Sequence, residues 1–320
     1  MSGMMNNFYY GKAGQADFTP EQLPANRVQL FFSMFRIRFS GLIGMNLLYL
    51  LFALPAILWT IFNLMAISGA GTVYSDAGEL ISQATVSTQE LLGYVNVYLL
   101  GMIPCLMILA FGTTGVTYVL RNWARDQHSF VMSDFKDAIK NNWKQTLLVG
   151  LINGLSLTVT FVCYRYYGMM AQESVFWIIP RTLVVCICAL WWMVNMLLFP
   201  MMVTYDMKFG TLVRNSFIMG LARLPFTLLF AVLPPALTIL AAFYVPYGWI
   251  VMIVFYLLIG MSGVLFMQVS YAVSCFDRYL NPRIEGAQVN MGLRDPKYND
   301  EEDDEEDDEE DENDPTLPKA

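Results

Sequence analysis

The chain has 320 residues, of which 56% are hydrophobic and only 14% are charged. Soluble globular proteins hold about 45–50% apolar and about 25% charged residues, so this composition excludes a water-soluble domain of this size. It also argues against a nucleic-acid-binding, collagen-like or disulfide-rich secreted protein. The net charge of −8 is unevenly placed, because 14 of the 27 acidic residues lie between Asp300 and Asp314, whereas residues 1–299 carry a net charge of +5.

The N-terminal arm, residues 1–38, is polar or mixed in character. It does not form the short apolar core with a cleavage site that a secretory signal requires. We therefore interpret it as a cytoplasmic arm that ends in an interfacial helix.

Six apolar stretches follow, each suited to cross the roughly 30 Å of hydrocarbon in a bilayer. Backbone groups in lipid must be hydrogen-bonded within their own segment, so each stretch is predicted to be a helix. The predicted spans are 41–65, 91–112, 146–164, 175–204, 225–245 and 248–273, within a membrane domain of residues 39–275. The sequence thus predicts an all-α integral membrane protein with six transmembrane helices.

Lysine and arginine predict the orientation of these spans, because they are enriched in cytoplasmic loops. They gather in the N-terminal arm, in the second and fourth connections, and in the C-terminal tail, whereas the opposite side holds only Arg165. Both termini are therefore predicted to be cytoplasmic. The segment Ala66–Glu90, which lacks lysine and arginine, becomes an outside loop.

Three segments before the odd-numbered spans share one spacing, with apolar residues at offsets 0, 3, 4 and 8 and a basic residue at offset 5. They are Phe31–Phe39, Phe135–Trp143 and Phe209–Phe217, with Arg36, Lys140 and Arg214 as the basic residues. The apolar offsets fall on one helical face. We predict three amphipathic helices in the cytoplasmic interface, with aromatic residues toward the lipid and cations toward the phosphates.

The second of these segments has further signals. Ser133 and Asp134 are predicted to cap its start. Lys136, Lys140 and Lys144 form a basic stripe at helical spacing.

A second trio, Val116–Tyr118, Val203–Tyr205 and Val269–Tyr271, lies at the cytoplasmic ends of the even-numbered spans. One interpretation is a threefold internal repeat of interfacial helix plus hairpin, since repeats are common in transporter folds. The other is chance, because helices that approach a membrane are generally amphipathic. The pattern alone leaves both open.

The Gly112-Thr113-Thr114-Gly115 segment is a candidate break in the second span. A straight helix from Leu91 to Leu120 would be roughly 45 Å long, more than a bilayer needs. A break at membrane depth would free backbone groups to bind a solute. We favour the alternative, a simple exit at the cytoplasmic edge, because basic residues follow at once.

Arg181 is the charged residue well inside a span, which makes it a functional hypothesis. At a depth of roughly 9 Å it can also snorkel to the outer headgroups, which is the interpretation we favour. Five asparagines either line a polar path or, more commonly, bond across helices: Asn46, Asn63, Asn96, Asn153 and Asn195. Gly150 and Gly154 predict a close-packing face on the third span.

The sequence lacks the combinations of residues that catalysis, metal binding or nucleotide hydrolysis would need. The five cysteines are scattered and are interpreted as small packing residues, and His128 is the single histidine. No acidic residue lies inside a span, and neither a Walker-type loop nor paired carboxylates occur. We expect no enzymatic activity, no catalytic residues, no metal and no cofactor.

The tail, residues 276–320, ends in the acidic run and is predicted to be disordered and solvated. The functional alternative for it is a tether for basic partners or a weak site for divalent ions.

Several stretches resemble the YesL-like family of bacterial integral membrane proteins, a family of unknown function. They are Asn46–Pro55, Gly112–Asn122, Ser133–Lys136, Lys140–Gln145 and Arg223–Pro225, within residues 27–280. In shorter family members the segment like Gly112–Gly115 directly follows the Leu-Pro end of the first span, whereas about 56 residues intervene here. The resemblance implies a bacterial cytoplasmic-membrane protein associated with carbohydrate uptake and glycoside degradation, with no established activity.

Three functions follow as hypotheses. The first is a non-enzymatic accessory or scaffold component of carbohydrate uptake, with membrane lipids and sugar-transporter subunits as partners and no nucleic acid. The second is a small-solute transporter or permease component, and the third, weaker one is a membrane-bound regulator. The candidate functional or structural residues are Gly112, Thr113, Thr114, Gly115, Arg121, Asn122, Asp134, Phe135, Lys140, Asn141, Trp143, Arg181, Phe209, Arg214 and Asn215.

Overall fold

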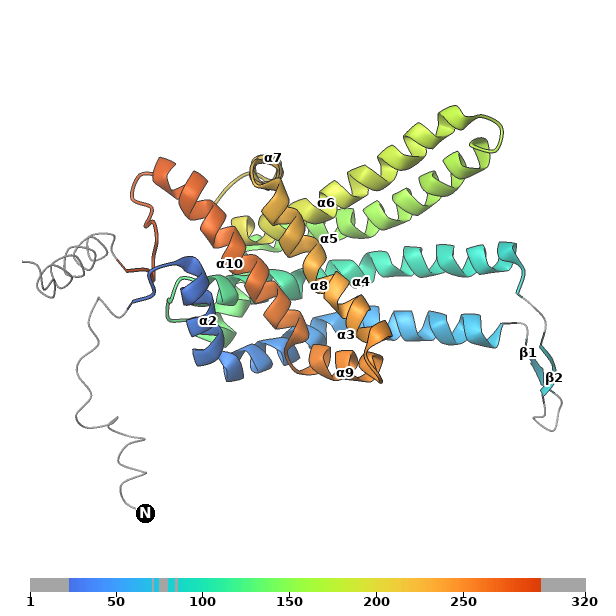
Figure 1. Ribbon diagram of the computed structural model, residues 1–320, viewed down its shortest axis with the longest axis horizontal. Coiled ribbons are helices and arrows are strands. Elements are labelled where there is room, and N and C mark those ends of the chain that lie inside the picture. The colour runs from blue at the N-terminus through green and yellow to red at the C-terminus, as the bar shows by residue number, and fades with distance from the viewer. Residues whose placement is uncertain (1–22, 71, 75–79, 84–85, 295–320) are drawn as a thin grey trace, which may run out of the picture.

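The computed structural model describes residues 23–70, 72–74, 80–83 and 86–294 (Figure 1). The elements in chain order are α2 (Arg27–Ile37), α3 (Phe39–Gly69), β1 (Thr72–Tyr74), β2 (Leu80–Gln83), α4 (Thr88–Trp123), α5 (Val131–Met170), the 3₁₀ turn η2 (Val175–Trp177), α6 (Ile178–Thr204), α7 (Phe209–Ala222), α8 (Leu224–Tyr244), α9 (Gly248–Phe255), the π-helix η3 (Tyr256–Gly260), α10 (Met261–Tyr279) and the 3₁₀ turn η4 (Asn281–Arg283). The acidic run Asp300–Asp314 and most of the N-terminal arm lie outside the described residues.

The six predicted spans are confirmed as six helical segments in the described chain that are long and apolar enough to cross a membrane. They are α3, α4, α5, η2 with α6, α8, and the run α9–η3–α10 with η4. The protein is therefore an integral membrane protein by length and composition of its helices. A short antiparallel β-hairpin, β1–β2, joins α3 to α4.

The two ends of the described chain meet at one end of the bundle, which we call the basic end. There the N–H of Arg294 donates to the carbonyl of Pro24 at 3.1 Å. Helices α3 and α4 run side by side away from this end, and the α5–α6 hairpin leans away from them (Figure 1). That the basic end faces the cytoplasm stays a prediction.

The buried core lies in the half of the bundle nearest the basic end. One cluster joins α6, α7 and α10 around Leu197, Met201 and Phe276. The other joins α2, α3, α4 and α10 around Leu42, Leu120 and Phe266. The far half of α6 is mostly exposed between Leu183 and Trp192, where lipid tails would surround it.

Two predictions about the segments before the spans are wrong. The segment Phe135–Trp143 is not a separate helix, because α5 continues without interruption into the third span over 40 residues. Ser133 and Asp134 do not cap it, since α5 begins at Val131 and its N-cap residue is Phe130. The Asp134 carboxylate instead accepts a hydrogen bond from the hydroxyl of Ser129 at 2.8 Å.

The apolar face of these segments packs mainly on protein rather than lipid. In each segment the residue at offset 3 is buried and the basic residue at offset 5 is exposed: Met34 and Arg36, Ala138 and Lys140, Leu212 and Arg214. Only the offset-8 residues Phe39, Trp143 and Phe217 remain largely exposed. The buried offset-3 residues thus anchor α2, α5 and α7 to the bundle, while the threefold repeat stays a prediction.

The candidate break at Gly112–Gly115, the interpretation that we did not favour, is absent, because α4 is continuous from Thr88 to Trp123. The hydroxyls of Thr113 and Thr114 donate to carbonyls one turn earlier, those of Leu109 and Ala110, each at 3.0 Å. Such bonds are compatible with an intact helix. The glycines serve close packing instead, since a Cβ on Gly112 would lie 2.6 Å from Cβ of Phe52.

The close-packing face predicted at Gly150 and Gly154 is confirmed. A Cβ on Gly150 would lie 2.7 Å from Cα of Met107, and one on Gly154 would lie 2.7 Å from Cα of Ile103. The backbones of α5 and α4 therefore touch at these two positions, as small residues allow between membrane helices.

We predict that Gly150→Ala destabilises the protein by about 1–3 kcal/mol, because the methyl group must push backbone against backbone. Gly44→Ala on α3 is the matched control, since a Cβ there meets nothing within 4 Å. The control should be neutral or slightly stabilising, because alanine favours helix. Thermal unfolding in mild detergent measures both variants, and equal midpoints would show that the α4–α5 contact is not tight.

Candidate functional site

A cavity of about 450 Å³ lies among α3, α4, α5, α6, α8 and α10. Its walls are mostly apolar and include Leu109, Met196 and Phe199. The polar residues among its lining are Tyr49, Thr113, Asn153, Trp192, Asn195 and Gln268. Each of the six helices thus contributes to one shared space.

Most polar groups of this cavity have partners in neighbouring helices. The hydroxyl of Tyr49 on α3 pairs with that of Thr113 on α4 at 2.8 Å. The indole N–H of Trp191 donates to Oδ1 of Asn153 at 2.8 Å. These contacts hold the amide and hydroxyl groups in place before any ligand arrives.

Asn195 is the exception. Its Nδ2 donates to the carbonyl of Trp191 one turn earlier, at 2.9 Å, but its Oδ1 is buried and has no hydrogen-bond partner among the described residues. A buried acceptor without a partner costs about 1–3 kcal/mol, so it is a natural point for a ligand hydroxyl. The lining residues carry amides, hydroxyls and an indole but no carboxylate, lysine or arginine.

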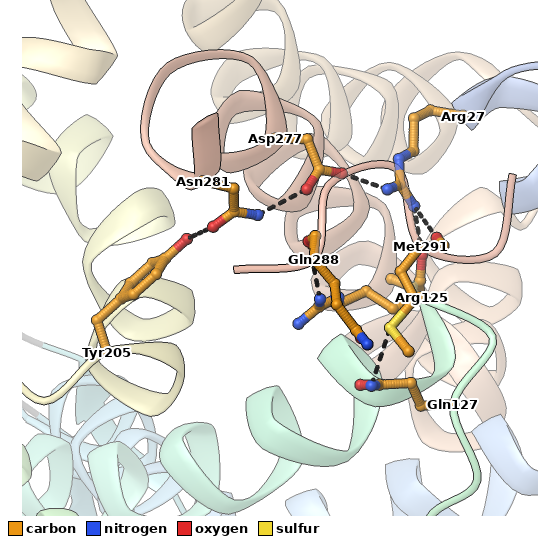
Figure 2. A network of polar contacts seen from close by, with 9 residues as sticks. Arg27, Arg125, Gln127, Tyr205, Asp277, Asn281, Gln288 and Met291 are labelled. Carbon is orange, nitrogen blue, oxygen red and sulfur yellow. Dashed lines mark hydrogen bonds and ion pairs between the residues drawn. The ribbon is translucent and has the colours of Figure 1, made fainter. Parts of the chain in front are cut away.

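A second polar cluster ties the basic end together (Figure 2). Arg27 of α2 forms an ion pair with Asp277 of α10, whose side chain is only 5% exposed. The other carboxylate oxygen of Asp277 accepts from Asn281 at 2.7 Å, and the hydroxyl of Tyr205 donates to Oδ1 of Asn281. A chain of contacts therefore runs from α2 through α10 to the end of α6.

Arg27 also reaches backbone on both sides. Its Nη1 donates to the carbonyls of Ala124 at 3.3 Å and Met291 at 3.0 Å. Burial lowers the pKa of the Arg27 guanidinium, and the carboxylate of Asp277 acts in the opposite direction. Burial, followed by the negative charge of Asp277, raises the pKa of Tyr205 to about 12. Because Arg27 contacts α10 and the backbone of two other segments at once, we interpret this cluster as structural.

The candidate residues from the sequence lie in several places. Thr113 is the one that lines the cavity. Thr114 is buried and its hydroxyl pairs with that of Thr146 on α5 at 2.9 Å. Phe135 packs into the space left by Gly115, where a Cβ would lie 2.4 Å from its ring. These residues join α4 to α5.

Arg121 and Asn122 lie at the basic end, where Nη1 of Arg121 donates to Oδ1 of Asn122 at 2.8 Å. Arg121 is close enough to Arg125 for their positive charges to interact. In the described chain neither arginine forms an ion pair with a carboxylate.

The remaining candidates lie away from the cavity. Lys140, Asn141 and Trp143 are on the exposed face of α5. On α7, Phe209 packs on the core cluster, Arg214 is exposed, and Nδ2 of Asn215 lies 3.5 Å from Sδ of Met207.

Arg181 stacks 4.0 Å above the ring of Tyr164 within the α5–α6 hairpin. It is not among the residues that line the cavity. The structure therefore does not bring Arg181 and the Gly112–Gly115 segment together.

The sequence analysis did not identify two polar residues that line the cavity, Tyr49 and Gln268. It also did not identify the Arg27–Asp277 ion pair of the polar cluster. Tyr49 and Gln268 are isolated polar residues in apolar helices, which was an available signal. The ion pair joins residues 250 positions apart in the chain, so spacing held no hint of it.

Comparison with known proteins adds one match. Residues 42–164 match the model of a family described as protein of unknown function, DUF624. The match covers α3 from Leu42, α4, and α5 as far as Tyr164, and so includes the Gly112–Gly115 segment. No curated protein and no solved structure is detectably similar to the chain.

Proposed function

We propose that the protein is a non-enzymatic membrane component of carbohydrate uptake that binds a small, neutral, hydroxyl-rich solute in the central cavity. The observation that carries this proposal is the unpartnered Oδ1 of Asn195, a residue that lines an uncharged cavity. Amides and hydroxyls offer the donors and acceptors that such a solute needs, and apolar walls suit the faces of its rings. The carbohydrate link comes from the YesL-like resemblance.

An accessory role fits the cavity better than independent active transport. No carboxylate or histidine lines it, so it holds no group of the kind that couples solute movement to protons. A partner would supply the energy. Co-purification from native membranes in mild detergent, followed by mass spectrometry, tests this role, and recovery of a sugar-transporter subunit at equal stoichiometry is the expected result.

A transporter in its own right is the second candidate. The observation that favours it is the shared lining from α3, α4, α5, α6, α8 and α10, since transporter sites lie where several spans meet. Facilitated uptake of a bound sugar by the purified protein alone in proteoliposomes would establish this function over the accessory one.

The solute site itself is tested by Asn195→Leu. We expect binding of the best ligand from a panel of neutral mono- and disaccharides, measured by calorimetry on the full chain, to weaken about tenfold, the equivalent of one good hydrogen bond. Asn142→Leu on α5 is the matched control, because Asn142 makes the same bond to its own helix, Nδ2 to the carbonyl of Ala138 at 2.9 Å, but does not line the cavity. Equal binding by both variants, or no saturable binding by the parent protein, would refute the proposal.

A further inference from the structure

A groove separate from the central cavity runs along α10 between α2 and α8. Its two parts have volumes of about 380 and 450 Å³ and share Phe31 and Met267 in their linings. The first part lies at the basic end, and the second continues along α8, α9 and α10 away from it. The two parts therefore adjoin at Phe31 and Met267, and we treat them as one groove.

The mouth of the groove is basic. Arg27 and Arg223 both line it, together with the hydroxyl-bearing residues Ser270 and Ser274. The guanidinium of Arg223 lies 5.1 Å from the ring centroid of Phe226 and 5.7 Å from that of Tyr271. In the described chain it has no carboxylate partner, and its one polar contact is with Sγ of Cys275 at 3.9 Å.

Arg27 adds a second positive group to the mouth. Its ion pair with Asp277 occupies Nη2, and the carbonyls of Ala124 and Met291 occupy Nη1, so Arg27 acts on an anion in the mouth through its charge. The two guanidinium groups and one carboxylate leave a net positive charge, which a single anionic group would balance. Guanidinium pairs with phosphate oxygens in a geometry that suits both.

Beyond the mouth the groove is apolar. Along α8 its lining extends from Phe226 to Ala241, which is about 22 Å of helix. One leaflet of a bilayer holds about 15 Å of hydrocarbon, so the groove is long enough for a complete acyl chain. At the far part Thr238 and Tyr256 pair their hydroxyls at 2.7 Å, so they present no free polar group to a chain.

We propose that this groove is a specific site for an anionic phospholipid. The phosphate lies between Arg27 and Arg223, and one acyl chain follows the slot between α8 and α10. The charge of the mouth selects the headgroup, and the apolar continuation separates a lipid from a free phosphate ion. On the predicted orientation the site belongs to the inner leaflet.

The test titrates the purified full chain in mild detergent with phosphatidylglycerol or with phosphatidylcholine of the same chain length, and counts bound lipid by native mass spectrometry. We expect about tenfold tighter binding of phosphatidylglycerol, because one charge-assisted contact is worth about that factor. Arg223→Gln should remove this preference. Arg278→Gln should keep it, since Arg278 is an exposed arginine on α10 that does not line the groove.

A second variant tests the apolar part without changing charge. Gly263 lines the groove, and a Cβ there meets nothing closer than 3.9 Å, so Gly263→Leu fills the slot without a clash at its root. This variant should weaken the binding of long-chain phosphatidylglycerol about tenfold, which is the equivalent of losing the burial of two methylene groups. If Arg223→Gln does not fold, Arg223→Met keeps the stem packed on the two rings and replaces it.

Three results would overturn the proposal. The first is equal binding of the two lipids, and the second is an equal effect of the Arg223 and Arg278 variants. The third is displacement of the lipid by glycerol phosphate at equal concentration with no effect of Gly263→Leu, which would assign the mouth to a free phosphate compound. None of these results depends on sugar binding, so this proposal and the function proposed above stand or fall separately.

Discussion

Asn46→Ala is expected to destabilise the membrane domain by about 3 kcal/mol, because it leaves buried backbone groups unpaired. Asn46 is fully buried on α3. Its Nδ2 donates to the carbonyls of Tyr256 and Leu257, and its Oδ1 accepts from the N–H of Ser262, each at 2.9 Å. The amide is thus inserted into the backbone hydrogen bonding of the sixth span at the π-helix η3.

The reason for the large effect is the lipid surroundings. A π-helix leaves backbone carbonyls without their usual partners, and inside hydrocarbon no water can bond to them. The side-chain amide of Asn46 on α3 is therefore required as their donor. The hydroxyl of Ser262 donates back to the carbonyl of Leu42 at 2.8 Å, which makes the contact between α3 and the sixth span reciprocal. Removing one amide therefore loosens both helices.

Asn63→Ala is the matched control for this prediction. Asn63 is also buried on α3, but its Nδ2 donates to the carbonyl of Trp59 in its own helix, at 2.9 Å. Its loss should cost about 1 kcal/mol or less. Thermal unfolding in mild detergent compares the two variants, and equal losses would show that Asn46 does not hold the sixth span.

The second large effect is expected at the Arg27–Asp277 ion pair. Asp277→Ala leaves the guanidinium of Arg27 buried without its counter-charge, and breaking a buried pair in this way costs about 3–5 kcal/mol. The same change removes the acceptor for Asn281 and so frees the chain of contacts to Tyr205 (Figure 2). We expect faster tryptic cleavage at Arg283 as well as a lower unfolding midpoint.

The double variant Arg27→Met with Asp277→Leu separates charge from packing. Apolar residues of similar size often replace a buried pair at little cost, so the double variant should be closer to the parent protein than Asp277→Ala alone. Asp137→Ala is the control on an exposed carboxylate, which lies 3.4 Å from the hydroxyl of Ser133, and it should shift stability by less than about 0.5 kcal/mol. A double variant as unstable as the single one would mean that the pair does not act through its charges.

Much of the architecture follows from the chain itself. A run of apolar residues must be helical in lipid whatever its neighbours are, so α3, α6 and α8 end within a few residues of their predicted limits. The spacing of Gly150 and Gly154 predicted a close helix contact for the same local reason, since only a residue without a side chain admits another backbone.

Other features depend on which faces of distant helices meet. Hydropathy measures length and polarity but not direction, so it could not tell that Gly112 and Gly115 receive the rings of Phe52 and Phe135 within one unbroken helix. It also placed the aromatic face of α2 against lipid, whereas the assembled bundle offers that face a protein surface, with Phe31 stacked 5.2 Å from Phe266 of α10.

The central cavity and the groove along α10 both depend on how distant helices pack. Tyr49, Thr113 and Asn195 come from three helices and converge only when the bundle is packed. Arg27 and Arg223 are 196 positions apart in the chain. From the sequence, each is an ordinary basic residue on the predicted cytoplasmic side. Local sequence decides that a segment crosses the membrane, because an apolar segment in lipid must be helical whatever its neighbours are. Tertiary packing decides where polar groups meet, because that depends on the relative rotation of helices far apart in the chain.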